Sequence, residues 1–358
     1  MTSKSQMVPS LSVVVPAYQA EHSIGRLLES ILLWDGNDIE VVVVDDGSTD
    51  RTSDIVADFA VRDSRIHLIN KRNGGRSSAR NVGIGASRGD WLMFADSDDC
   101  LLDGWAQKVR NYMRENFDLV VFSMLRSDGL DSFDCSPVAP PKEDRVIKTA
   151  AEIKNILIDG SFRNYLEASG HFEWNACWGR LYRRSNVDSI VSATDGEVFP
   201  EGLKFSEDRL FNLRYLSILG DKPVLFDYSA IYYWDMGLSS TVAHVSSGDA
   251  ESLIAFRKAL DGLAGAVEGA SVVLVMSMEI ASQFRRAATL PVSELSEATV
   301  TWQKVLDSGA LRGCKRYVAS FMGKRSWMFR PAVWLLYAGY PHAALWFQHL
   351  IQILGAIV

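Results

Sequence analysis

The first 120 residues alternate short apolar runs with segments of helical periodicity, and this alternation constrains the fold more than any other feature of the chain. The expected strands are 11–15, 41–44, 66–69 and 91–95, and the expected helices between them are 24–33, 52–63 and 77–86. Strands that are apolar at nearly every position are typical of a parallel sheet with helices on both faces. The sequence therefore predicts an α/β domain that binds its ligand at the carboxyl edge of the sheet.

The pattern changes after residue 120. Residues 123–148 are rich in Asp, Ser and Pro and are expected to form a surface excursion. Regular patterning resumes at 150–158, and residues 207–219 have the spacing of an amphipathic helix. Strand-like pieces follow at 224–226 and 231–234.

From Gly248 onward the pattern indicates helices. The expected helices lie near 249–266, 271–289, 294–307 and 311–322. We therefore predict two regions, an α/β domain in residues 1–245 and a mostly helical C-terminal region in residues 246–358.

Charge is distributed unevenly along the chain. The sequence has 37 Lys and Arg against 44 Asp and Glu, which gives a formal net charge of −7. Residues 309–358 contain six Lys and Arg and no Asp or Glu, so this tail is +6 and residues 1–308 carry −13. An acidic body argues against nucleic acid as a partner. The basic tail is a separate feature that needs its own explanation.

Cysteine use and the first residues favour a cytoplasmic protein. The four cysteines are scattered and lack both close pairing and the density of a disulfide scaffold. Residues 1–10 contain one Lys and no apolar segment, so no export signal is expected. No stretch reaches the roughly 18 uninterrupted apolar residues that a membrane span needs.

The expected strand 41–44 runs directly into two carboxylates. Asp45 and Asp46 are followed by Gly47 and Ser48, which supply a turn. Carboxylates at this edge of an α/β sheet are candidate ligand groups. Asp before Gly-Ser is also ordinary turn and N-cap chemistry, so this motif alone is compatible with either interpretation.

Three carboxylates follow the expected strand 91–95 within four residues, namely Asp96, Asp98 and Asp99. They repel one another unless a cation or ordered donors compensate. The one-residue spacing lets Asp96 and Asp98 point toward one site, and oxygen ligands suit a hard cation such as Mg²⁺ or Mn²⁺. The alternative is a solvated acidic turn before a helix that starts near Asp103.

Residues 73–83 combine glycines with a helix start. Ser77 is a good N-cap, and Arg76 and Arg80 offer forked donors to phosphate oxygens near a helix N-terminus. The segment matches neither the dinucleotide-binding nor the Walker A pattern. Solvated arginines at an ordinary helix start are the alternative.

Four motifs, taken together and in this order, resemble the family 2 glycosyltransferases. They are residues 13–18 (VVVPAY), 44–50 (VDDGSTD), 75–83 (GRSSARNVG) and 96–99 (DSDD). A weaker likeness continues through 178–185 and 199–208. The resemblance implies the GT-A fold, a Rossmann-like, mixed and mainly parallel sheet flanked by helices, and an enzyme that uses a nucleotide-diphosphate sugar.

The resemblance also implies roles for individual residues. The implied nucleotide-sugar-binding residues are Pro16, Ala17, Tyr18, Asp45, Asp46, Arg76, Arg80, Asp96 and Ser97. Asp46, with Asp45 beside it, is expected to meet the base or ribose, and Arg80 the base or diphosphate. Asp96 is expected to reach the ribose and Asp98 the metal, with Asp96 as a further metal ligand.

Glu207 and Asp208 match the family's Glu-Asp pair, in which the aspartate is taken as the general base. An acceptor hydroxyl must lose its proton as it attacks the anomeric carbon, and a positioned carboxylate can receive that proton. A bound Mg²⁺ or Mn²⁺ neutralises charge on the leaving nucleoside diphosphate. The implied outcome is inversion by single displacement. The alternative is an acidic first turn that complements the dipole of a helix.

The sequence departs from the family within residues 232–241, and the resemblance fades after about residue 241. Asp235 stands where family members often carry a basic residue. His244 is a candidate contact for metal or phosphate in its place, although a lone His near a loop is more often structural. Trp174, Trp178 and Trp234 are candidate sugar-stacking faces, with core packing as the alternative.

The tail has a charge-free end, since no charged residue follows Arg330. Gln348, His349 and Gln352 fall on one helical face, which is typical of an amphipathic helix rather than a membrane span. With its basic start, the tail 310–358 has the composition of a surface for an anionic membrane. The alternative is a helical subdomain that packs on the catalytic domain or on a second subunit as a homo-oligomer.

We therefore predict an inverting glycosyltransferase that serves polysaccharide biosynthesis in the cell envelope. Its donor is a nucleotide-diphosphate sugar, with a UDP-sugar favoured, and its acceptor is a glycan, polysaccharide or lipid-linked sugar. The expected location is the cytoplasm, with peripheral contact on the inner face of the membrane. A nucleotidyltransferase is disfavoured because residues 16–18 replace its glycine-rich phosphate loop. A non-catalytic sugar-nucleotide or glycan-binding module is disfavoured because both Asp98 and Asp208 are present.

Overall fold

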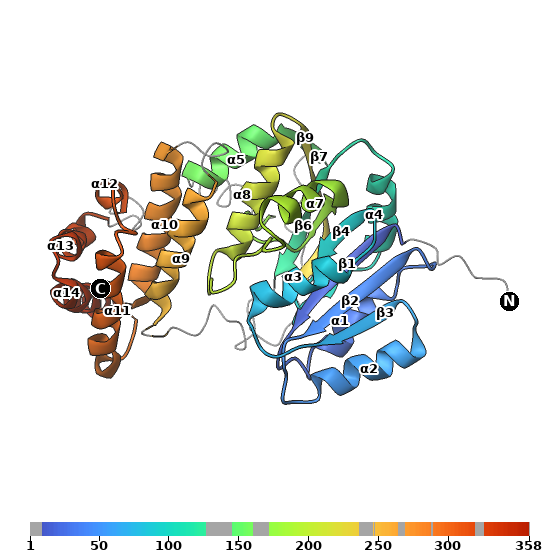
Figure 1. Cartoon of the computed structure of the whole chain (residues 1–358), viewed down its shortest axis with the longest axis horizontal. Helices are drawn as coiled ribbons and strands as arrows, with labels where there is room; N and C mark the ends of the chain where they lie inside the picture. Colours follow the sequence, from blue (N-terminus) through green and yellow to red (C-terminus); the bar gives the residue numbers. More distant parts are fainter. Residues whose placement is uncertain are drawn as a thin grey trace. The chain divides into compact units, whose positions relative to one another are not determined.

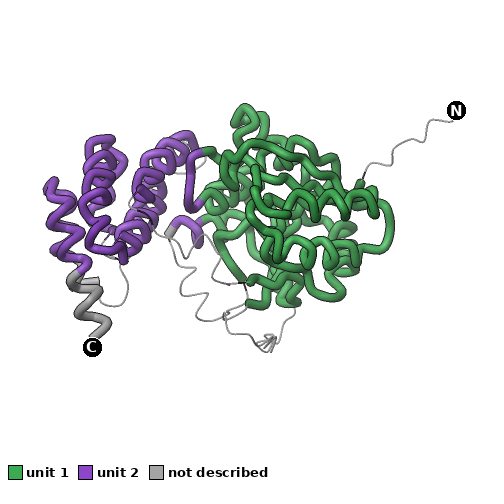
Figure 2. Tube along the Cα trace, turned by 90° about the horizontal axis from the view of Figure 1, so that it is seen from below, with its two compact units in different colours: residues 1–154, 162–201, 207–238 green, residues 155–161, 202–206, 239–358 purple. Residues whose placement is uncertain are grey.

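The chain forms two compact units, which Figure 2 shows in different colours. The computed structural model describes residues 9–126, 145–159, 172–235, 246, 248–263, 269–287, 289–318 and 326–357. The first unit comprises residues 1–154, 162–201 and 207–238, and the second comprises 155–161, 202–206 and 239–358. The second unit thus begins before residue 246, where the sequence suggested a boundary, and it includes two short segments from earlier in the chain.

A mixed sheet of nine strands, counted over the described residues, is the framework of the first unit (Figure 1). The strands are β1 (Leu11–Ala17), β2 (Ile39–Asp45), β3 (Ile66–Asn70), β4 (Trp91–Phe94), β5 (Cys100–Leu101), β6 (Leu119–Arg126), β7 (Arg145–Thr149), β8 (Arg180–Arg183) and β9 (Pro223–Trp234). Their order is β3-β2-β1-β4-β8-β6-β9-β5, and β7 pairs with β9. The ladders β3-β2-β1-β4 and β6-β9 are parallel, while β8, β5 and β7 pair antiparallel to their neighbours. The predicted mixed, mainly parallel sheet is confirmed.

Helices pack on both faces of this sheet, as the apolar strands predict. The helices up to residue 238 are α1 (Ile24–Ile31), α2 (Thr52–Arg62), α3 (Arg76–Ala86), α4 (Trp105–Met113), α5 (Ala150–Asp159), α7 (Arg184–Ala193) and α8 (Glu207–Leu219). Val13 and Val43 belong to the core cluster that contains the apolar side of α1. Val42 packs instead with Ala79 of α3 on the opposite face. Successive strand residues therefore contribute to two cores, which is why almost none of them is polar.

Two local predictions in the middle of the chain are wrong. Ser123, expected in a surface excursion, is buried within β6, and residues 145–149 form β7 rather than a loop. Phe122 and Met124 flank this serine and continue the apolar strand, which the Ser-rich composition obscured. The strand expected in two pieces is the continuous β9, whose pairing with β6 shifts register beside Ser123. Residues 127–144 lie outside the described part of the chain.

Helix α8 has the predicted bounds but not the predicted amphipathic character. Its polar residues Arg209 and Asn212 are buried along with its apolar ones. The Asn212 amide donates to the carbonyl oxygens of Asn175 (2.7 Å) and Ala176 (3.0 Å) and accepts from the Tyr182 hydroxyl (2.9 Å). Because these buried polar groups have partners, α8 is a core helix of the first unit rather than a half-exposed one.

The second unit is helical in its described residues beyond 246, as predicted. Its elements are η2 (Asp249–Glu251), α9 (Ser252–Asp261), α10 (Gly269–Ala287), η3 (Val292–Glu294), α11 (Leu295–Asp307), α12 (Lys315–Val318), α13 (Ser326–Tyr337) and α14 (Pro341–Ile357). Phe284 of α10 and Trp302 of α11 meet edge to face with ring centroids 5.3 Å apart. The helix expected at 311–322 starts later, at Lys315, because Gly313 has a φ of 81° that a helix cannot contain.

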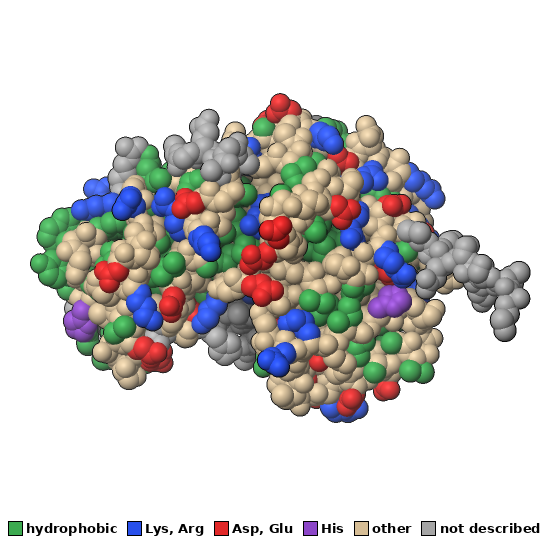
Figure 3. All heavy atoms as spheres, in the orientation of Figure 1, with side chains coloured by type: hydrophobic (Ala, Val, Ile, Leu, Met, Phe, Trp, Pro, Cys, Tyr) green, Lys and Arg blue, Asp and Glu red, His purple; other side chains and the backbone are tan. Residues whose placement is uncertain are grey.

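The tail differs from the expected amphipathic helix at Gln348, which the sequence placed on the polar face. Gln348 of α14 is fully buried, whereas Trp334 of α13 is 58% exposed and Tyr340 is 60% exposed. Apolar side chains gather over α13 and α14 at the left of Figure 3. Over the described residues, every helix is too short or too polar to cross a membrane.

The close approach of α3 to β1 gives a test of the core. A Cβ atom at Gly83 would collide with Cγ1 of Val14, whereas a Cβ atom at Gly85, two residues on in the same helix, would meet open space. Gly83→Ala is expected to lower the free energy of unfolding by about 1–3 kcal/mol through overpacking. Gly85→Ala is the matched control and is expected to raise it by up to about 1 kcal/mol through helix propensity. Urea unfolding measures both, and equal effects of the two substitutions would contradict this packing.

Candidate functional site

The carboxyl ends of three strands bring the predicted motifs to one edge of the sheet. Ala17 at the end of β1 lies opposite Asp45 at the end of β2, and the Asp46 amide donates to the Ala17 carbonyl at 2.8 Å. The Ala95 amide, just beyond β4, donates to the carbonyl of Val14 at 3.1 Å. Residues 16–18, the Asp45-Asp46 pair and the acidic turn after β4 therefore share this edge, which is where open α/β sheets bind ligands.

Asp46 holds the glycine-rich loop that starts α3. Its buried carboxylate accepts hydrogen bonds from the amides of Gly74 (3.0 Å) and Gly75 (2.7 Å) and from Nζ of Lys71 (2.7 Å). Gly75 has a φ of 86°, which a residue with a side chain rarely adopts, and it directly precedes Arg76 at the start of the helix. Lys71 was missed from the sequence, although its place after strand β3 put it at the same edge.

The Asp45 carboxylate also has hydrogen-bond partners, and both belong to the turn that follows it. Its carboxylate accepts from the amide of Ser48 at 3.3 Å and from the Ser48 hydroxyl. The turn interpretation of this motif is therefore correct for Asp45, while Asp46 extends the contact to the next loop. Tyr18 is 52% exposed at the same edge, and Ser97 is partly exposed in the turn after β4.

Arg80 is the centre of the charged cluster. This fully buried guanidinium contacts Oδ1 of Asp96 at 2.8 Å, Oε1 of Glu207 at 3.2 Å and Oδ1 of Asp208 at 2.5 Å. Nε of Arg76 lies 3.2 Å from the same Glu207 oxygen. Two arginines of α3 thus draw together the turn after β4 and the first residues of α8.

The environment of Arg80 differs from the predicted one. The resemblance implied contact with a base or diphosphate, whereas the guanidinium is bound to three carboxylates and stands 5.3 Å from the ring of Phe199. Burial disfavours its charge, but Asp208 and the other carboxylates outweigh burial and hold the pKa of Arg80 above its ordinary value. The role that this geometry supports is to orient carboxylates.

Two opposing effects set the pKa of Asp208. Burial raises the pKa of this carboxyl to about 6, and the positive charge of Arg80 limits the rise, while the neighbouring Glu207 adds to it. A carboxylate with a pKa near 6 is ionised at neutral pH and is a stronger proton acceptor than an exposed aspartate. Strongly shifted carboxylates in one cluster are typical of catalytic sites.

The three aspartates after β4 have different surroundings. Asp99 is buried, accepts from the Tyr232 hydroxyl (2.5 Å) and the Asp235 amide (2.9 Å), and so holds the turn to β9. Burial, and then the charge of Asp96, raise the pKa of Asp98 to about 6. Of this acidic turn, Asp98 is the carboxylate that remains partly exposed without an arginine bound to it.

Arg26 and Tyr232 support the acidic turn and were not predicted. Nη2 of Arg26 donates to the Asp98 carbonyl at 2.6 Å and pairs with Asp235 at 3.0 Å. The Tyr232 hydroxyl accepts from the Asp96 amide at 3.0 Å while it donates to Asp99. Asp235, where the family often has a basic residue, is thus bound to a basic residue of α1. On α1 this arginine lies on the side opposite the buried apolar residues, so helical periodicity gave no signal for its role.

The residues present are compatible with a divalent cation held jointly with a diphosphate. In the part of the chain that the structure describes, no three His, Cys, Asp or Glu side chains form a metal cage. Asp96 gives one oxygen to Arg80, and Asp98 lies beside it. Mg²⁺ is typically held by one or two carboxylates together with substrate phosphates, which matches this donor set. His244 lies outside the described residues.

The tryptophans of the first unit fit core packing rather than sugar stacking. Trp178 lies parallel to Tyr232 with ring centroids 4.5 Å apart, so that one face of its indole is covered. Trp174 is buried 5.3 Å from the ring of Phe226. Trp234 is partly buried and lies 5.5 Å from Trp178.

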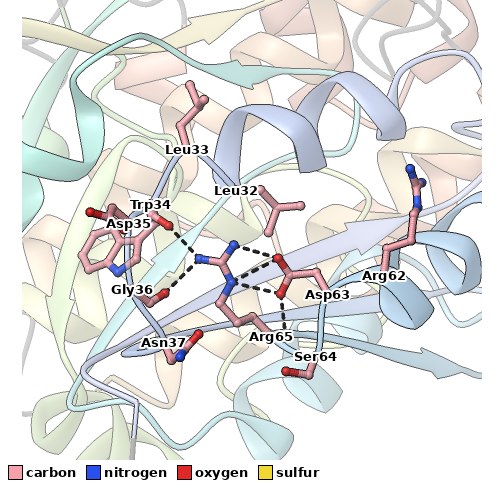
Figure 4. Close-up of a pocket in the computed structure, with 10 residues that line it drawn as sticks. All are labelled: Leu32, Leu33, Trp34, Asp35, Gly36, Asn37, Arg62, Asp63, Ser64 and Arg65. Atoms are coloured by element: carbon pink, nitrogen blue, oxygen red, sulfur yellow. Dashed lines mark hydrogen bonds and ion pairs between the residues drawn. The ribbon is translucent and has the colours of Figure 1, made fainter.

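A shallow hollow of about 530 Å³ lies at the opposite edge of the sheet, where β2 and β3 begin (Figure 4). Arg65 crosses it and donates to the carbonyl oxygens of Trp34 (2.6 Å) and Gly36 (2.9 Å) while it pairs with Asp63 at 2.7 Å. The guanidinium is therefore used within the fold. This hollow lies at the amino end of the sheet and contains no residue of the charged cluster.

Part of the chain is similar in sequence to known proteins. Residues 12–187 match the family described as Glycosyl transferase family 2. The chain is 33% identical over 210 residues to EpsJ of Bacillus subtilis, described as an uncharacterized glycosyltransferase, in an alignment that covers 58% of this chain and 56% of EpsJ. It is 50% identical over 93 residues to the succinoglycan biosynthesis protein ExoO of Rhizobium meliloti, which is 26% of each chain.

A solved structure shares the fold of nearly the whole chain. The crystal structure of S. aureus TarS 1–349 in complex with UDP-GlcNAc matches with a TM-score of 0.64 and 21% identity, covering 97% of this chain and 92% of that one. The shared fold confirms the expected GT-A architecture. The match to glycosyl transferase family 2 covers slightly less than half of the chain. The chain spans little more than half the length of EpsJ.

Arg80→Met tests the charged cluster. Removal of this cation leaves buried carboxylates unpaired, and the free energy of unfolding is expected to fall by about 3–5 kcal/mol at pH 7. Without the cation the folded state keeps protons that the unfolded state releases, so the loss should grow as the pH rises from 5 to 8. Urea unfolding across that range measures it.

Arg145→Met is the control for this change. Arg145 pairs with Glu115 at 3.3 Å, but both side chains are substantially exposed, so less than about 1 kcal/mol is expected. A loss at Arg80 that equals the control, or that does not vary with pH, would contradict the central role of this guanidinium.

Proposed function

We propose that this protein transfers a sugar from a nucleotide-diphosphate sugar to an acceptor hydroxyl with inversion at the anomeric carbon. The observation that carries the proposal is the bonding of Arg80 to Asp96 and Asp208, which holds a donor-side and a base-side carboxylate in one cluster. TarS was crystallised with UDP-GlcNAc, and this supports a UDP-sugar as the favoured donor. A nucleotidyltransferase would not need a carboxylate at the position of Asp208.

Asp208 is the proposed general base. Its Oδ1 is held by Arg80, which leaves Oδ2 to accept the proton of the acceptor hydroxyl as that oxygen attacks the anomeric carbon. The bond between the anomeric carbon and the diphosphate oxygen breaks as the new glycosidic bond forms, so no covalent enzyme intermediate is required. Glu207 is bound by both Arg76 and Arg80 and serves to fix the first turn of α8.

The donor is proposed to bind along the carboxyl edge of β1, β2 and β4. Pro16, Ala17 and Tyr18 line the nucleotide pocket, with the exposed Tyr18 ring able to lie against the base. Asp46 shapes the loop beside the ribose through its bonds to Gly74 and Gly75.

Asp98, with Asp96, is proposed to hold Mg²⁺ or Mn²⁺ against the diphosphate. When bound, the ion acts as a Lewis acid that neutralises the charge of the leaving nucleoside diphosphate. Asp96 keeps its bond to Arg80, which orients the turn, and Ser97 lies between the two carboxylates. The partial exposure of Asp98 and its pKa near 6 support a site that gains from a nearby positive charge.

The acceptor is proposed to be a glycan, polysaccharide or lipid-linked sugar of the cell envelope. The name of ExoO, a succinoglycan biosynthesis protein, supports this class. Contact of residues 310–358 with an anionic membrane on its cytoplasmic side stays a prediction. The exposed Arg330 and Trp334, one turn apart on α13, support it, since a cation beside an aromatic ring suits a lipid interface. The buried Gln348 supports the alternative of a packed helical subdomain or a homo-oligomer.

Asp208→Asn tests the base. We expect kcat to fall by at least about 100-fold because the amide cannot accept the proton, while donor binding stays within severalfold. Turnover is measured as release of the nucleoside diphosphate, with the donor chosen by a thermal-shift screen of UDP-, GDP- and dTDP-sugars with Mn²⁺. In the parent enzyme kcat/KM should fall as the pH drops below about 6, because protonated Asp208 is not a base.

Asp188→Asn is the control for this substitution, since Asp188 is an exposed aspartate on α7 that pairs only with its neighbour Arg184 among the described residues. It should leave both kcat and the acidic limb of the pH profile unchanged. Full turnover by Asp208→Asn would remove this residue from the role of base.

Asp98→Asn tests the metal site. We expect donor binding in Mn²⁺ to weaken by about tenfold or more, and binding in EDTA to change little, because a metal-ligating oxygen is lost. Asp103→Asn, an exposed aspartate five residues on, is the matched control. Calorimetry with and without Mn²⁺ measures both, and unchanged Mn²⁺-dependent binding by Asp98→Asn would contradict the assignment.

A further inference from the structure

The five residues that lead into the proposed base belong to the helical unit. Residues 202–206 are part of the second unit, although the chain on either side of them belongs to the first (Figure 2). Glu207 and Asp208 follow them without a break as the first residues of α8. The residues directly before the base are therefore part of the second unit.

Ser206, the last residue of this segment, is bound to α10. Its hydroxyl donates a short hydrogen bond to Oε2 of Glu279. Glu279 is buried, and its other oxygen accepts from Nε2 of Gln283 at 2.9 Å, one turn further along the helix. Both oxygens of this buried carboxylate are thus used, and one of them holds the residue before Glu207.

Two further contacts fix the same segment within the second unit. The guanidinium of Arg286 lies 4.3 Å from the centre of the Phe205 ring. Nζ of Lys204 lies 3.4 Å from the buried carboxylate of Asp249, which is also 3.7 Å from Arg286. Three consecutive residues are therefore each bound to the C-terminal helices, by a hydrogen bond, a cation–π contact and an ion pair.

The backbone at Ser206 is in a conformation that needs such support. Its φ is 64°, in the left-handed region that residues other than glycine seldom occupy. Conformations of this kind persist where the surrounding structure over-determines them, and they concentrate at functional sites. A serine directly before a helix usually directs its side chain to the helix's own first amides. Here the hydroxyl proton goes to Glu279 instead.

We propose that Glu279 and Ser206 are positioning residues for the general base. Their hydrogen bond fixes the left-handed turn at Ser206, and this turn sets the direction in which α8 starts and hence the direction of the Asp208 carboxylate. The inference rests on the proposed role of Asp208. In this role neither residue contacts the donor or the acceptor.

Loss of the hydrogen bond between Ser206 and Glu279 is expected to change kcat and not the KM for donor. The donor is bound by the ends of β1, β2 and β4, which contain neither residue. Loss of the hydrogen bond misdirects the base without removing a donor contact, so kcat falls and the KM for donor stays nearly constant. A small displacement of a reacting group is sufficient for a large change in rate.

The test uses three substitutions and a matched control in the full chain. Ser206→Ala and Glu279→Ala each remove the bond. Glu279→Gln keeps one oxygen to accept from Ser206 and gains an amide that can serve the Gln283 oxygen, which has no hydrogen-bond partner among the described residues. Ser277→Ala, the matched control, removes a buried hydroxyl from the same helix, α10. The Ser277 hydroxyl donates to the carbonyl oxygens of Val273 and Cys314 and not to residues 202–206.

Turnover is measured as nucleoside diphosphate release from the UDP-, GDP- or dTDP-sugar that gives the largest thermal shift with Mn²⁺. Ser206→Ala and Glu279→Ala are expected to lower kcat by about tenfold, with KM for donor within about twofold of the parent. Glu279→Gln and Ser277→Ala are expected to stay within about twofold in both constants. The double variant Ser206→Ala/Glu279→Ala should be no slower than either single variant, since both remove one interaction.

Hydrogen exchange gives a second measurement that does not depend on the donor. Amides at the start of α8 should exchange faster in Ser206→Ala and Glu279→Ala than in Ser277→Ala. Unchanged exchange and unchanged kcat in the first two variants, or an equal loss in Ser277→Ala, would overturn the positioning role. Full turnover by Asp208→Asn would instead overturn the proposed base, so the two failures are distinguishable.

Discussion

The site depends on one buried cation. The guanidinium of Arg80 is excluded from water, and a charge in that position is tolerable only when carboxylates and hydrogen bonds replace its hydration. Asp96, Glu207 and Asp208 supply them from chain positions 16 to 128 residues away. The electrostatic requirement of a single arginine therefore joins the turn after β4 to the start of α8.

The same balance sets the chemistry of Asp208. Burial raises the pKa of the carboxyl, and Arg80 opposes that rise, so the group is ionised near neutrality but remains a useful proton acceptor. Asp46 shows the other use of a buried carboxylate, since its oxygens hold the amides of Gly74 and Gly75. Asp46 thus builds a loop, whereas Asp208 is the carboxylate proposed to act as the base.

The helical unit includes residues from the middle of the chain as well as the C-terminal helices. It contains residues 202–206, which precede the proposed base. Three residues of this segment contact Glu279, Arg286 and Asp249 of the same unit. Its interior also takes up Gln348, a residue whose polarity suggested an exposed position. Glu279 and Asp249 make contacts within this unit that helical periodicity alone could not show.

The sequence by itself determined the parallel strands, their helices and the acidic motifs at the strand ends, because these depend on periodicity and on residues adjacent in the chain. It also indicated Glu207 and Asp208, through resemblance to a family. Only the tertiary structure decided the partners of Arg80, the burial of Ser123 within β6 and the attachment of Ser206 to α10. These contacts join residues far apart in sequence, and local pattern does not encode which distant carboxylate will neutralise a buried cation.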